Sequence, residues 1–297
     1  ALCEQGRNFC SKIWNAFRLI KGWTVDDNIQ APDAAKLAVH WFESKQNEVA
    51  AEVADLFSKY RLSEALMAVY KLFWDEFSSW YLEIIKPAYG EGIPSSIHDC
   101  TLRFFDNLLH LLHPFMPFIT EEIWQHLPHE GETIMLAKWP EQEESLISAE
   151  IDKQMELTIE VIRAIRNLRS EMNVPLGKKA EVIICANNPE YTVYLKDGAN
   201  YILSLASAES LSVEETLAAK PTQAATAVVH GIEIYLPLKG LIDLDKEIAR
   251  LEKELTKMEG EIKRIEGKLA NEGFVAKAPA EVIEKEKEKL VKYQASK

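Results

Sequence analysis

The C-terminal end of the chain carries an apolar repeat that few folds can accommodate. Between residues 241 and 269 the apolar side chains follow alternating steps of four and three, at Leu244, Ile248, Leu251, Leu255, Met258, Ile262, Ile265 and Leu269. A repeat averaging about 3.5 residues keeps one stripe facing one partner helix, as in a coiled coil. Most of the other side chains are charged, which suits a helix surrounded by water. The sequence therefore predicts a helix that stands out from a globular body.

A second charged helix is expected after Pro279, so that residues 239–297 form an antiparallel coiled-coil hairpin. This limb is shorter than the first, and at ~1.5 Å per residue it cannot reach the start of the repeat. The early apolar residues are therefore expected to meet sequence beyond Lys297, the globular body or another molecule. The arm holds 14 Lys or Arg against 13 Asp or Glu, so its charge alone does not indicate nucleic-acid binding.

Composition limits the class of protein and the kind of binding surface. The 297 residues are 47% hydrophobic and 27% charged, which is typical of a soluble chain with about two domains and an appendage. No stretch approaches the ~18 consecutive apolar residues of a membrane span. Four cysteines without a Cys-x-x-Cys pair favour a reduced, cytoplasmic setting. A net charge of −13 argues against nucleic-acid binding by the whole surface, so such binding must come from local patches.

Residues 1–150 are expected to form a helical bundle around one core. Apolar residues recur every three or four positions, which predicts helices over residues 4–21, 33–60, 63–86 and 95–113, and a short one from residue 120. Asp33, Ser63 and Thr120 are predicted to start three of these helices, because side chains of these types cap helices. Residues 129–150 are expected to form a strand or an extended connector.

Residues 151–238 are predicted to form a small α/β domain. The first part, residues 151–173, has the pattern of an amphipathic helix, and residues 180–186 have that of a β-branched strand. Residues 190–205 are expected to be helical, although an Asp-Gly pair weakens the pattern, and residues 224–236 to form one or two strands. The expected fold class is therefore mainly α, with a helical bundle, a small α/β domain and a C-terminal hairpin.

The motifs of a catalytic or metal site are absent from the sequence. It contains no phosphate-binding glycine-rich loop, no Gly-x-Ser-x-Gly and no His-Glu-x-x-His. His110 and His113 share a helix face but lack a third ligand nearby, so a structural role is favoured. Glu121 and Glu122 are better explained by a helix start, where acids complement the helix dipole, than by acid–base catalysis. We therefore predict no catalytic residue and no metal ligand in this chain.

Two local patches are positively charged although the chain as a whole is acidic, and they are candidate nucleic-acid contacts. One lies on the first helix, opposite an apolar face that includes Trp14, and consists of Arg7, Asn8, Lys12, Asn15 and Arg18. Side chains of these types contact unpaired base edges and phosphates, and the alternative is an ordinary solvated helix face. The other patch places three arginines on one side of the helix over residues 151–173, namely Arg163, Arg166 and Arg169. The alternative for this patch is that acids such as Glu160 neutralise it locally. Aromatic residues between 73 and 81 could stack bases, but their helical spacing favours the core.

Several stretches resemble the valyl-tRNA synthetase family of class I aminoacyl-tRNA synthetases. Residues 6–18, GRNFCSKIWNAFR, are similar to the first helix of its anticodon-binding domain. Residues 72–87 and residues 113–124, HPFMPFITEEIW, are similar to later helices of that domain, and residues 166–173, RNLRSEMN, to its linker domain. The most specific match is KLANEGFVAKAP at residues 268–279, which resembles the tip of the family's C-terminal coiled coil. The likeness follows the family's order along the whole chain.

This resemblance implies a role for each part of the chain. Residues 1–150 would be the anticodon-binding bundle, residues 151–238 the linker domain and residues 239–297 a tRNA-binding arm. The ligand would be tRNA(Val), with the anticodon at Arg7, Asn8, Lys12, Asn15 and Arg18. Contacts with the tRNA backbone are implied for Arg163, Arg166, Arg169, Lys263, Arg264, Lys268 and Lys277. Position 19, where the family often has an aromatic residue that could stack a base, is Leu19 here.

By the same resemblance, catalytic and editing domains lie upstream of Ala1 in the same polypeptide. ATP and Mg²⁺ would bind to that catalytic domain, so no cofactor is expected in this chain. Its role would be to position tRNA(Val) for ATP-dependent aminoacylation. Two alternatives remain open, namely a structural protein whose coil joins two chains, and the anticodon domain of an isoleucyl- or leucyl-type relative.

Overall fold

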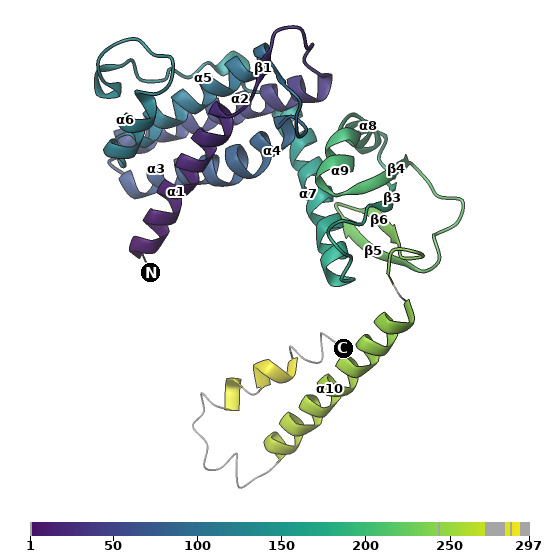
Figure 1. The fold of residues 1–297 in the computed structure, drawn as a ribbon. Coiled ribbons are helices and arrows are strands. Elements are labelled where there is room, and N and C mark those ends of the chain that lie inside the picture. The colour runs from purple at the N-terminus through teal and green to yellow at the C-terminus, as the bar shows by residue number, and fades with distance from the viewer. Residues whose placement is uncertain (1, 243, 271–282, 286, 292–297) are drawn as a thin grey trace.

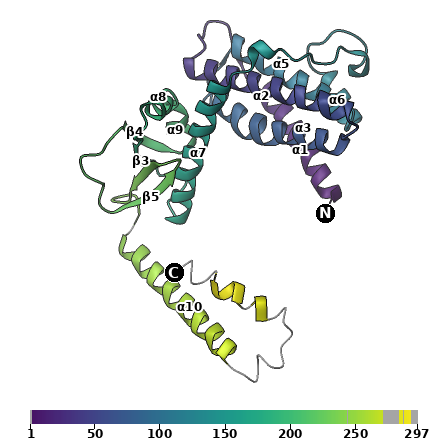
Figure 2. The same cartoon turned by 180° about the vertical axis from the view of Figure 1, so that it is seen from behind.

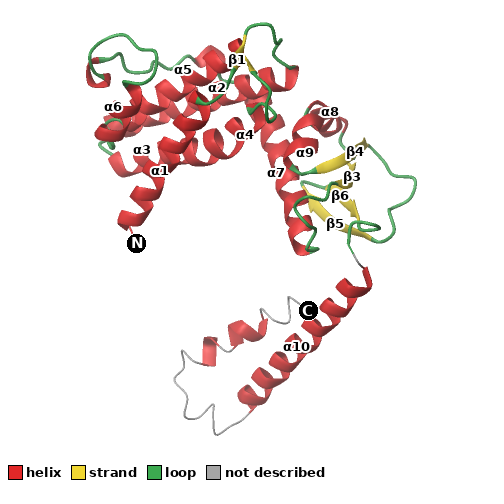
Figure 3. Ribbon diagram, in the orientation of Figure 1, coloured by secondary structure: helices red, strands yellow, loops and turns green. Residues whose placement is uncertain are grey.

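The protein is described by a computed structural model, which covers residues 2–242, 244–270, 283–285 and 287–291. Within this part the chain is mainly helical with a small sheet, as the sequence predicts, and the sheet has four strands (Figure 3). The N-terminal helices pack together, a sheet covered by helices follows, and a long helix extends beyond the sheet (Figure 1). The view from behind shows the same succession (Figure 2).

The N-terminal helices enclose an aromatic core. They are α1 (Leu2–Lys21), α2 (Asp33–Ser58), α3 (Leu62–Lys71), η1 (Leu72–Tyr81), α4 (Leu82–Ile85), α5 (Ser95–Leu112) and α6 (Pro117–Trp124). Phe42 of α2 lies 5.0–5.2 Å, between ring centroids, from Phe77 and Tyr81 of η1 and Phe104 of α5. Such ring contacts hold the helices together beyond simple burial of apolar area. The predicted core placement is confirmed for Phe77, Tyr81 and Trp80, all of which are buried.

The predicted helix over residues 63–86 is continuous but has a wide middle section, η1, which is a π-helix. In a π-helix the backbone hydrogen bonds span five residues. The Ser79 hydroxyl also donates across this span, to the Trp74 carbonyl oxygen at 2.7 Å. Apolar spacing did not predict this section, because the apolar residues in it still recur at steps of three and four. It matters for the site, because Trp74 and Ser79 both contact α1.

The three predicted helix caps are wrong. α2 begins at Asp33 itself, and the Asp33 carboxylate pairs with Lys36 at 2.9 Å instead of capping the helix. α3 begins at Leu62, so that Ser63 lies inside its first turn. α6 begins at Pro117, and the Thr120 hydroxyl donates to the Met116 carbonyl oxygen. Proline fixes the backbone for entry into a helix, so the start of α6 needs no capping hydroxyl.

The connector before residue 150 contains no strand. It has two short 3-10 turns, η2 (Ile134–Leu136) and η3 (Glu144–Leu146), and is otherwise extended. Of the two expectations for this segment, the extended connector is therefore confirmed. A separate two-residue strand pair, β1 (Val25–Asp26) and β2 (Ile93–Pro94), joins the loop after α1 to the start of α5.

The C-terminal sheet has the order β4-β3-β6-β5. Its strands are β3 (Ala180–Cys185), β4 (Ala208–Glu214), β5 (Ala224–Val229) and β6 (Ile232–Pro237). β5 and β6 form a hairpin whose turn residues, His230 and Gly231, both have positive φ, as two-residue hairpin turns require. β4, which pairs parallel to β3, was not predicted. Of its seven residues only Ala208 and Val213 are buried, so its sequence lacks the alternation that marks a strand.

α7 (Ala149–Glu171) joins the N-terminal helices to the sheet, because it packs against α2 on one side and against β5 and β6 on the other. At its first turn the Ser44 hydroxyl donates to the Asp152 carboxylate at 3.0 Å. The Lys45 ammonium lies 2.9 Å from Glu156 and 3.6 Å from Asp152. The buried apolar residues of the two parts form one continuous core through this helix.

The predicted helix over residues 190–205 is divided into α8 (Pro189–Asp197) and α9 (Ala199–Leu205). Gly198 stands at the break, directly against α7. A Cβ atom at this position would lie 2.8 Å from Thr158 Cγ2 and 3.0 Å from Thr158 Oγ1. Thr158 is itself buried, so the glycine is required for the close approach of the two segments.

Gly198→Ala is expected to lower the free energy of unfolding by about 2 kcal/mol, because overpacking at a buried contact forces neighbouring groups to move. Urea denaturation measures the change. In a Thr158→Ala background the same substitution should cost less than half as much, since the clashing atoms are gone. Gly6→Ala is the control, because a Cβ there has no neighbour within 4 Å. Equal costs in both Thr158 backgrounds would show that the contact is not the cause.

α10 (Leu244–Ala270) carries the predicted apolar repeat. In its C-terminal half Ile265 is only 1% exposed, whereas nearer the start Ile248 is 53% exposed and Leu255 40% exposed. The exposure of Ile248 agrees with the expected shortage of partners at the start of the repeat. Residues 283–285 and 287–291 are helical. The side chains of Leu244 and Leu251 lie outside the described set.

Two further observations concern the described residues. None of their helices is long and apolar enough to cross a membrane. Within the same set, no group of three or more His, Cys, Asp or Glu side chains could hold a metal ion.

Candidate nucleic-acid interface

α1 presents its polar stripe to solvent. Arg7, Asn8, Asn15 and Arg18 are exposed, and Lys12 is half-buried. The helix forms because a second set of residues, spaced by three or four, packs into the core: Phe9, Ile13, Ala16, Phe17 and Ile20. In the part of the chain that the structure describes, no carboxylate lies within 4.0 Å of the three basic groups of the stripe. Among these described residues, no carboxylate neutralises their charges.

Lys12 is the member of the stripe that the protein itself positions. Its ammonium group lies 4.6 Å from the centre of the Trp74 ring and 3.4 Å from the Ser79 hydroxyl oxygen. Both partners come from the π-helix η1, so the wide turn of that segment holds this cation in place. Trp74 also stacks on Tyr70, at 5.5 Å between ring centroids. Lys12 is therefore oriented before any ligand arrives, whereas the Arg7 guanidinium has a long 3.5 Å hydrogen bond to its neighbour Asn8.

Trp14 is a residue of α1 that the sequence placed on the apolar face, and this placement is wrong. It is 36% exposed, and one side of its indole contacts Phe17 at 5.5 Å between ring centroids. It lies one helical turn before Arg18, on the same side of the helix. An exposed indole beside a guanidinium is a surface on which a base can stack. The steps of four, three and four that join residues 7, 11, 14 and 18 place them on one side of a helix. This spacing could have predicted that Trp14 lies beside Arg7 and Arg18.

The expectation that the three arginines of α7 share one side of the helix is wrong. Arg163 and Arg166 lie over the same ring, that of Trp80, with Cζ 5.3 Å and 5.2 Å from its centre. Arg169 is instead buried at 7% exposure. Residues six apart are turned by about 120° at 3.6 residues per turn, which carries the third arginine toward the sheet.

Arg169 binds the protein's own backbone. Its guanidinium donates to the carbonyl oxygens of Lys178 at 2.6 Å, Pro175 at 3.3 Å and Ser207 at 3.3 Å. These carbonyls belong to the loop after α7 and to the residue before β4, so the side chain ties the loop to the sheet. Burial lowers the pKa of Arg169, and no carboxylate contributes to the shift. Its implied contact with the tRNA backbone stays a prediction that this geometry does not favour.

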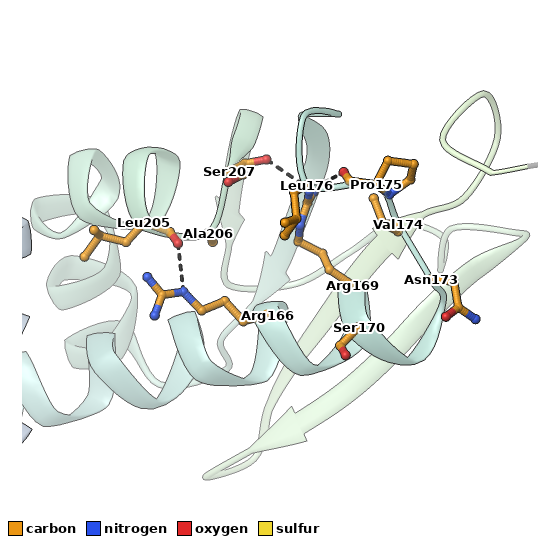
Figure 4. A pocket seen from close by; sticks show the side chains of 10 residues that line it. All are labelled: Arg166, Arg169, Ser170, Asn173, Val174, Pro175, Leu176, Leu205, Ala206 and Ser207. Atoms are coloured by element: carbon orange, nitrogen blue, oxygen red, sulfur yellow. Dashed lines mark hydrogen bonds between the residues drawn. The ribbon is translucent and has the colours of Figure 1, made fainter. Parts of the chain in front are cut away.

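A cavity of about 580 Å³ opens beside these arginines (Figure 4). Its lining consists of Arg166, Arg169, Ser170, Asn173, Val174, Pro175, Leu176, Leu205, Ala206 and Ser207. Arg166 donates from Nε to the Leu205 carbonyl oxygen at 2.8 Å, which fixes the plane of its guanidinium. The arginine that lies deeper in the wall, Arg169, points its terminal nitrogens toward Ser207 and Pro175.

The basic residues implied for the arm are placed in part. Lys263 and Arg264 are exposed on α10, and Arg264 pairs with Glu261 at 2.7 Å. Lys268 is half-buried in the last turn of the same helix. Lys277 lies outside the described residues. The structure therefore brings three of these four cations onto one helix, far along the chain from α1.

The residues considered for acid–base or metal chemistry have structural contacts. His110 is buried and pairs through Nδ1 with the Asp106 carbonyl oxygen at 2.9 Å, and His113 pairs through Nδ1 with Thr120 at 2.7 Å. Glu121 accepts from the Thr133 hydroxyl at 2.7 Å. Although burial opposes the shift, this bond and those from Gln125 and the Ile134 N–H lower the pKa of Glu121. The predicted placement of Glu121 at a helix start is wrong, since α6 begins at Pro117.

Comparison with known proteins gives the same reading for two separate parts of the chain. Residues 39–184 match the family model of the anticodon-binding domain of tRNA ligase, and residues 243–297 match that of the valyl tRNA synthetase tRNA binding arm. A valine--tRNA ligase of Bacteroides thetaiotaomicron is 54% identical over 295 residues, which is 97% of this chain and 32% of that protein. The valine--tRNA ligase of Bacillus licheniformis is 44% identical over 299 residues, 98% of this chain and 34% of its own length.

The chain belongs to the valyl-tRNA synthetase family. It spans about a third of the length of the curated relatives it matches. It holds the anticodon-binding domain and the tRNA-binding arm of a valyl-tRNA synthetase. The match to the anticodon-binding model begins at residue 39, after α1, whereas the full-length relatives align with nearly the whole chain. The α1 stripe therefore lies outside the domain match.

Proposed function

We propose that this chain recognises tRNA(Val) at two places and holds it for ATP-dependent aminoacylation elsewhere in the polypeptide. The stripe on α1 receives the anticodon, and the arm contacts the outer corner of the tRNA. The observation that carries the proposal is the stripe itself. It presents Arg and Asn side chains in a row, without a protein counter-charge among the described residues, on a chain with a net charge of −13.

The side chains divide the anticodon contacts according to their chemistry. Asn8 and Asn15 can each donate and accept hydrogen bonds at base edges. Lys12, which is held over Trp74, and Arg7 and Arg18 supply positive charge to phosphates or to acceptor atoms of bases. Trp14 offers the stacking surface that Leu19 lacks. On the arm, Lys263, Arg264, Lys268 and Lys277 are the proposed contacts with the tRNA corner.

The proposed division of labour follows the chain. Residues 1–150 form the anticodon-binding bundle, residues 151–238 the linker domain, and residues 239–297 an antiparallel coiled-coil arm. The continuous core through α7 supports a fixed placement of the first two parts. The further partners are catalytic and editing domains of the same polypeptide, and the proposed setting is the cytoplasm. ATP and Mg²⁺ are assigned to that catalytic domain.

Arg18→Ala is expected to weaken binding of tRNA(Val) by about 1–2 kcal/mol, or roughly 5–30-fold, the usual range for one good contact with a base or phosphate. Filter binding of the 297-residue chain measures the affinity. The same tRNA with a substituted anticodon should bind the wild-type chain more weakly. Its affinity should change little when Arg18 is replaced by alanine.

Lys36→Ala serves as the matched control, because it removes an exposed cation that pairs with Asp33 outside the stripe. It should change the affinity by less than about twofold, as most exposed ion pairs contribute little. An unchanged preference for the valine anticodon in Arg18→Ala would disprove the assignment of α1 to the anticodon.

A further inference from the structure

The joint between the sheet and the arm, residues 238–242, is a turn with a defined shape. The carbonyl oxygen of Leu238 accepts from the N–H groups of Leu241 at 3.0 Å and Ile242 at 3.3 Å. Leu238 and Leu241 are both buried in the core of the sheet domain. Gly240 lies between them with a φ of 77°, a backbone conformation that favours glycine. The arm therefore leaves the sheet from a folded turn.

Lys178 connects this joint to the end of α7. Its ammonium group donates to the carbonyl oxygens of Leu241 at 3.2 Å and Gly240 at 3.4 Å. Its own carbonyl oxygen accepts from the Arg169 guanidinium at 2.6 Å. The backbone of Lys178 is thus held by α7, while its side chain holds the joint.

The loop that carries Lys178 is itself held in place. The Lys178 N–H donates to the Pro175 carbonyl oxygen at 3.0 Å, and the same oxygen accepts from Arg169 at 3.3 Å. Two residues after Lys178, Ala180 begins β3. A lysine suits this position, because an ammonium group has three donors and can serve two carbonyl oxygens at once. The side chain therefore reaches the joint from a fixed starting point.

We propose that Lys178 is a positioning residue, which sets the direction in which the arm leaves the sheet. α10 begins at Leu244, two residues beyond the joint, and runs away from the sheet (Figure 1). At ~1.5 Å per residue its 27 residues extend about 40 Å, so a tilt of about 10° at the joint moves the far end by about 7 Å. A small change at the joint is therefore amplified along the helix.

The consequence for binding rests on the proposed function. Two linked contacts with one RNA reinforce each other only when the geometry allows both at the same time. A fixed direction of the arm keeps α1 and the arm at a spacing that one tRNA can span.

Distances between spin labels on the sheet domain and on α10 test the positioning without any RNA. The labels are attached through Lys196→Cys on α8 and Lys257→Cys on α10, both exposed positions, in a chain whose four native cysteines are changed to alanine. Lys178→Met should broaden the distribution of distances or shift its mean by about 5 Å or more. Lys178→Arg should restore the narrow distribution, since a guanidinium can also donate to two carbonyl oxygens. Lys178 is exposed, so its replacement removes no buried group and should leave the domain folded.

Lys179→Met is the matched control, because it removes the same charge one residue away. Within the described residues, Lys179 is exposed and makes no hydrogen bond to the arm. Its distances should equal those of the wild-type chain. Identical distributions for Lys178→Met and Lys179→Met, whether narrow or broad, would overturn the proposal, and so would a failure of Lys178→Arg to restore the wild-type distances.

RNA binding separates this proposal from the proposed function. Lys178→Met should bind tRNA(Val) about 5–10-fold more weakly than Lys179→Met, because part of the benefit of two linked contacts is lost. An isolated anticodon stem-loop, which does not reach the arm, should bind both variants alike. If the wild-type chain binds neither RNA, the proposed function is refuted, and the label distances still decide the role of Lys178. Altered distances with unchanged tRNA affinity would support the positioning role and refute simultaneous binding at two places.

Discussion

Replacing Arg169 with methionine is expected to lower the free energy of unfolding by about 3 kcal/mol. The guanidinium is buried and satisfies three backbone carbonyls, of Pro175, Lys178 and Ser207. Hydrogen bonds from a charged donor contribute about 1.5–3 kcal/mol each, part of which offsets the cost of burying the charge. Methionine keeps much of the volume but leaves the carbonyls without a donor. Urea denaturation at neutral pH measures the change.

Arg166→Met provides the comparison, because Arg166 has one protein hydrogen bond and is exposed. It should cost less than about 1 kcal/mol in stability. At temperatures where both variants are folded, Arg166→Met should lose tRNA affinity and Arg169→Met should keep it. Equal loss of stability in the two variants, or loss of tRNA affinity in folded Arg169→Met, would contradict a structural role for Arg169 and a binding role for Arg166.

The second large effect is a dependence of stability on pH at Asp152. Burial raises the pKa of this carboxyl from 3.8 to about 6, although Lys45 and the Ser44 hydroxyl oppose the shift. One oxygen of the buried carboxylate has no hydrogen-bond partner, which accounts for the preference for the protonated form. The folded chain therefore holds this proton more tightly than the unfolded chain does. Its contribution to stability is present below about pH 4 and is lost as the pH rises through 6.

At about 1.4 kcal/mol per pH unit, the difference between 3.8 and about 6 corresponds to as much as about 3 kcal/mol. Asp152→Asn removes the titrating group. The difference in unfolding free energy between Asp152→Asn and the wild-type chain should therefore grow in favour of the variant between pH 4 and pH 8. Urea denaturation across this range measures it. A difference that stays constant, or that shrinks, would show that Lys45 keeps the folded carboxylate ionised.

Much of the fold follows from apolar spacing alone. α1, α2, α7 and the strand β3 were predicted within a few residues, because each buries a regular set of side chains against a neighbour. β4 was missed because most of its face stays open, and the π-helix because its apolar steps match those of an ordinary helix. The caps predicted at Asp33 and Thr120 failed because Pro32 and Pro117 set the entry into their helices without a capping side chain.

The site was predicted unevenly for a geometric reason. The α1 stripe needs only helical spacing, so Arg7, Asn15 and Arg18 could be placed from the sequence. The arginines of α7 could not, because a step of three residues lags about 60° behind a full turn. Two such steps place Arg169 on the side of the helix that faces the sheet. No local sequence pattern shows that its guanidinium will contact backbone carbonyl oxygens there. The shared indole of Trp80 is equally hidden, since it lies on a different helix about 80 residues earlier.

α7 also acts as a strut. At ~1.5 Å per residue its 23 residues extend about 35 Å, and both ends are anchored, by Asp152 and Ser44 at one end and by Arg169 at the other. Just beyond it, the Lys178 ammonium donates to the carbonyl oxygens of Gly240 and Leu241, where the arm begins. If tRNA binds at both proposed places, a tRNA with one base pair inserted into its anticodon stem is expected to fit at one of them only. The length of the tRNA would then be selected independently of the bases that are read.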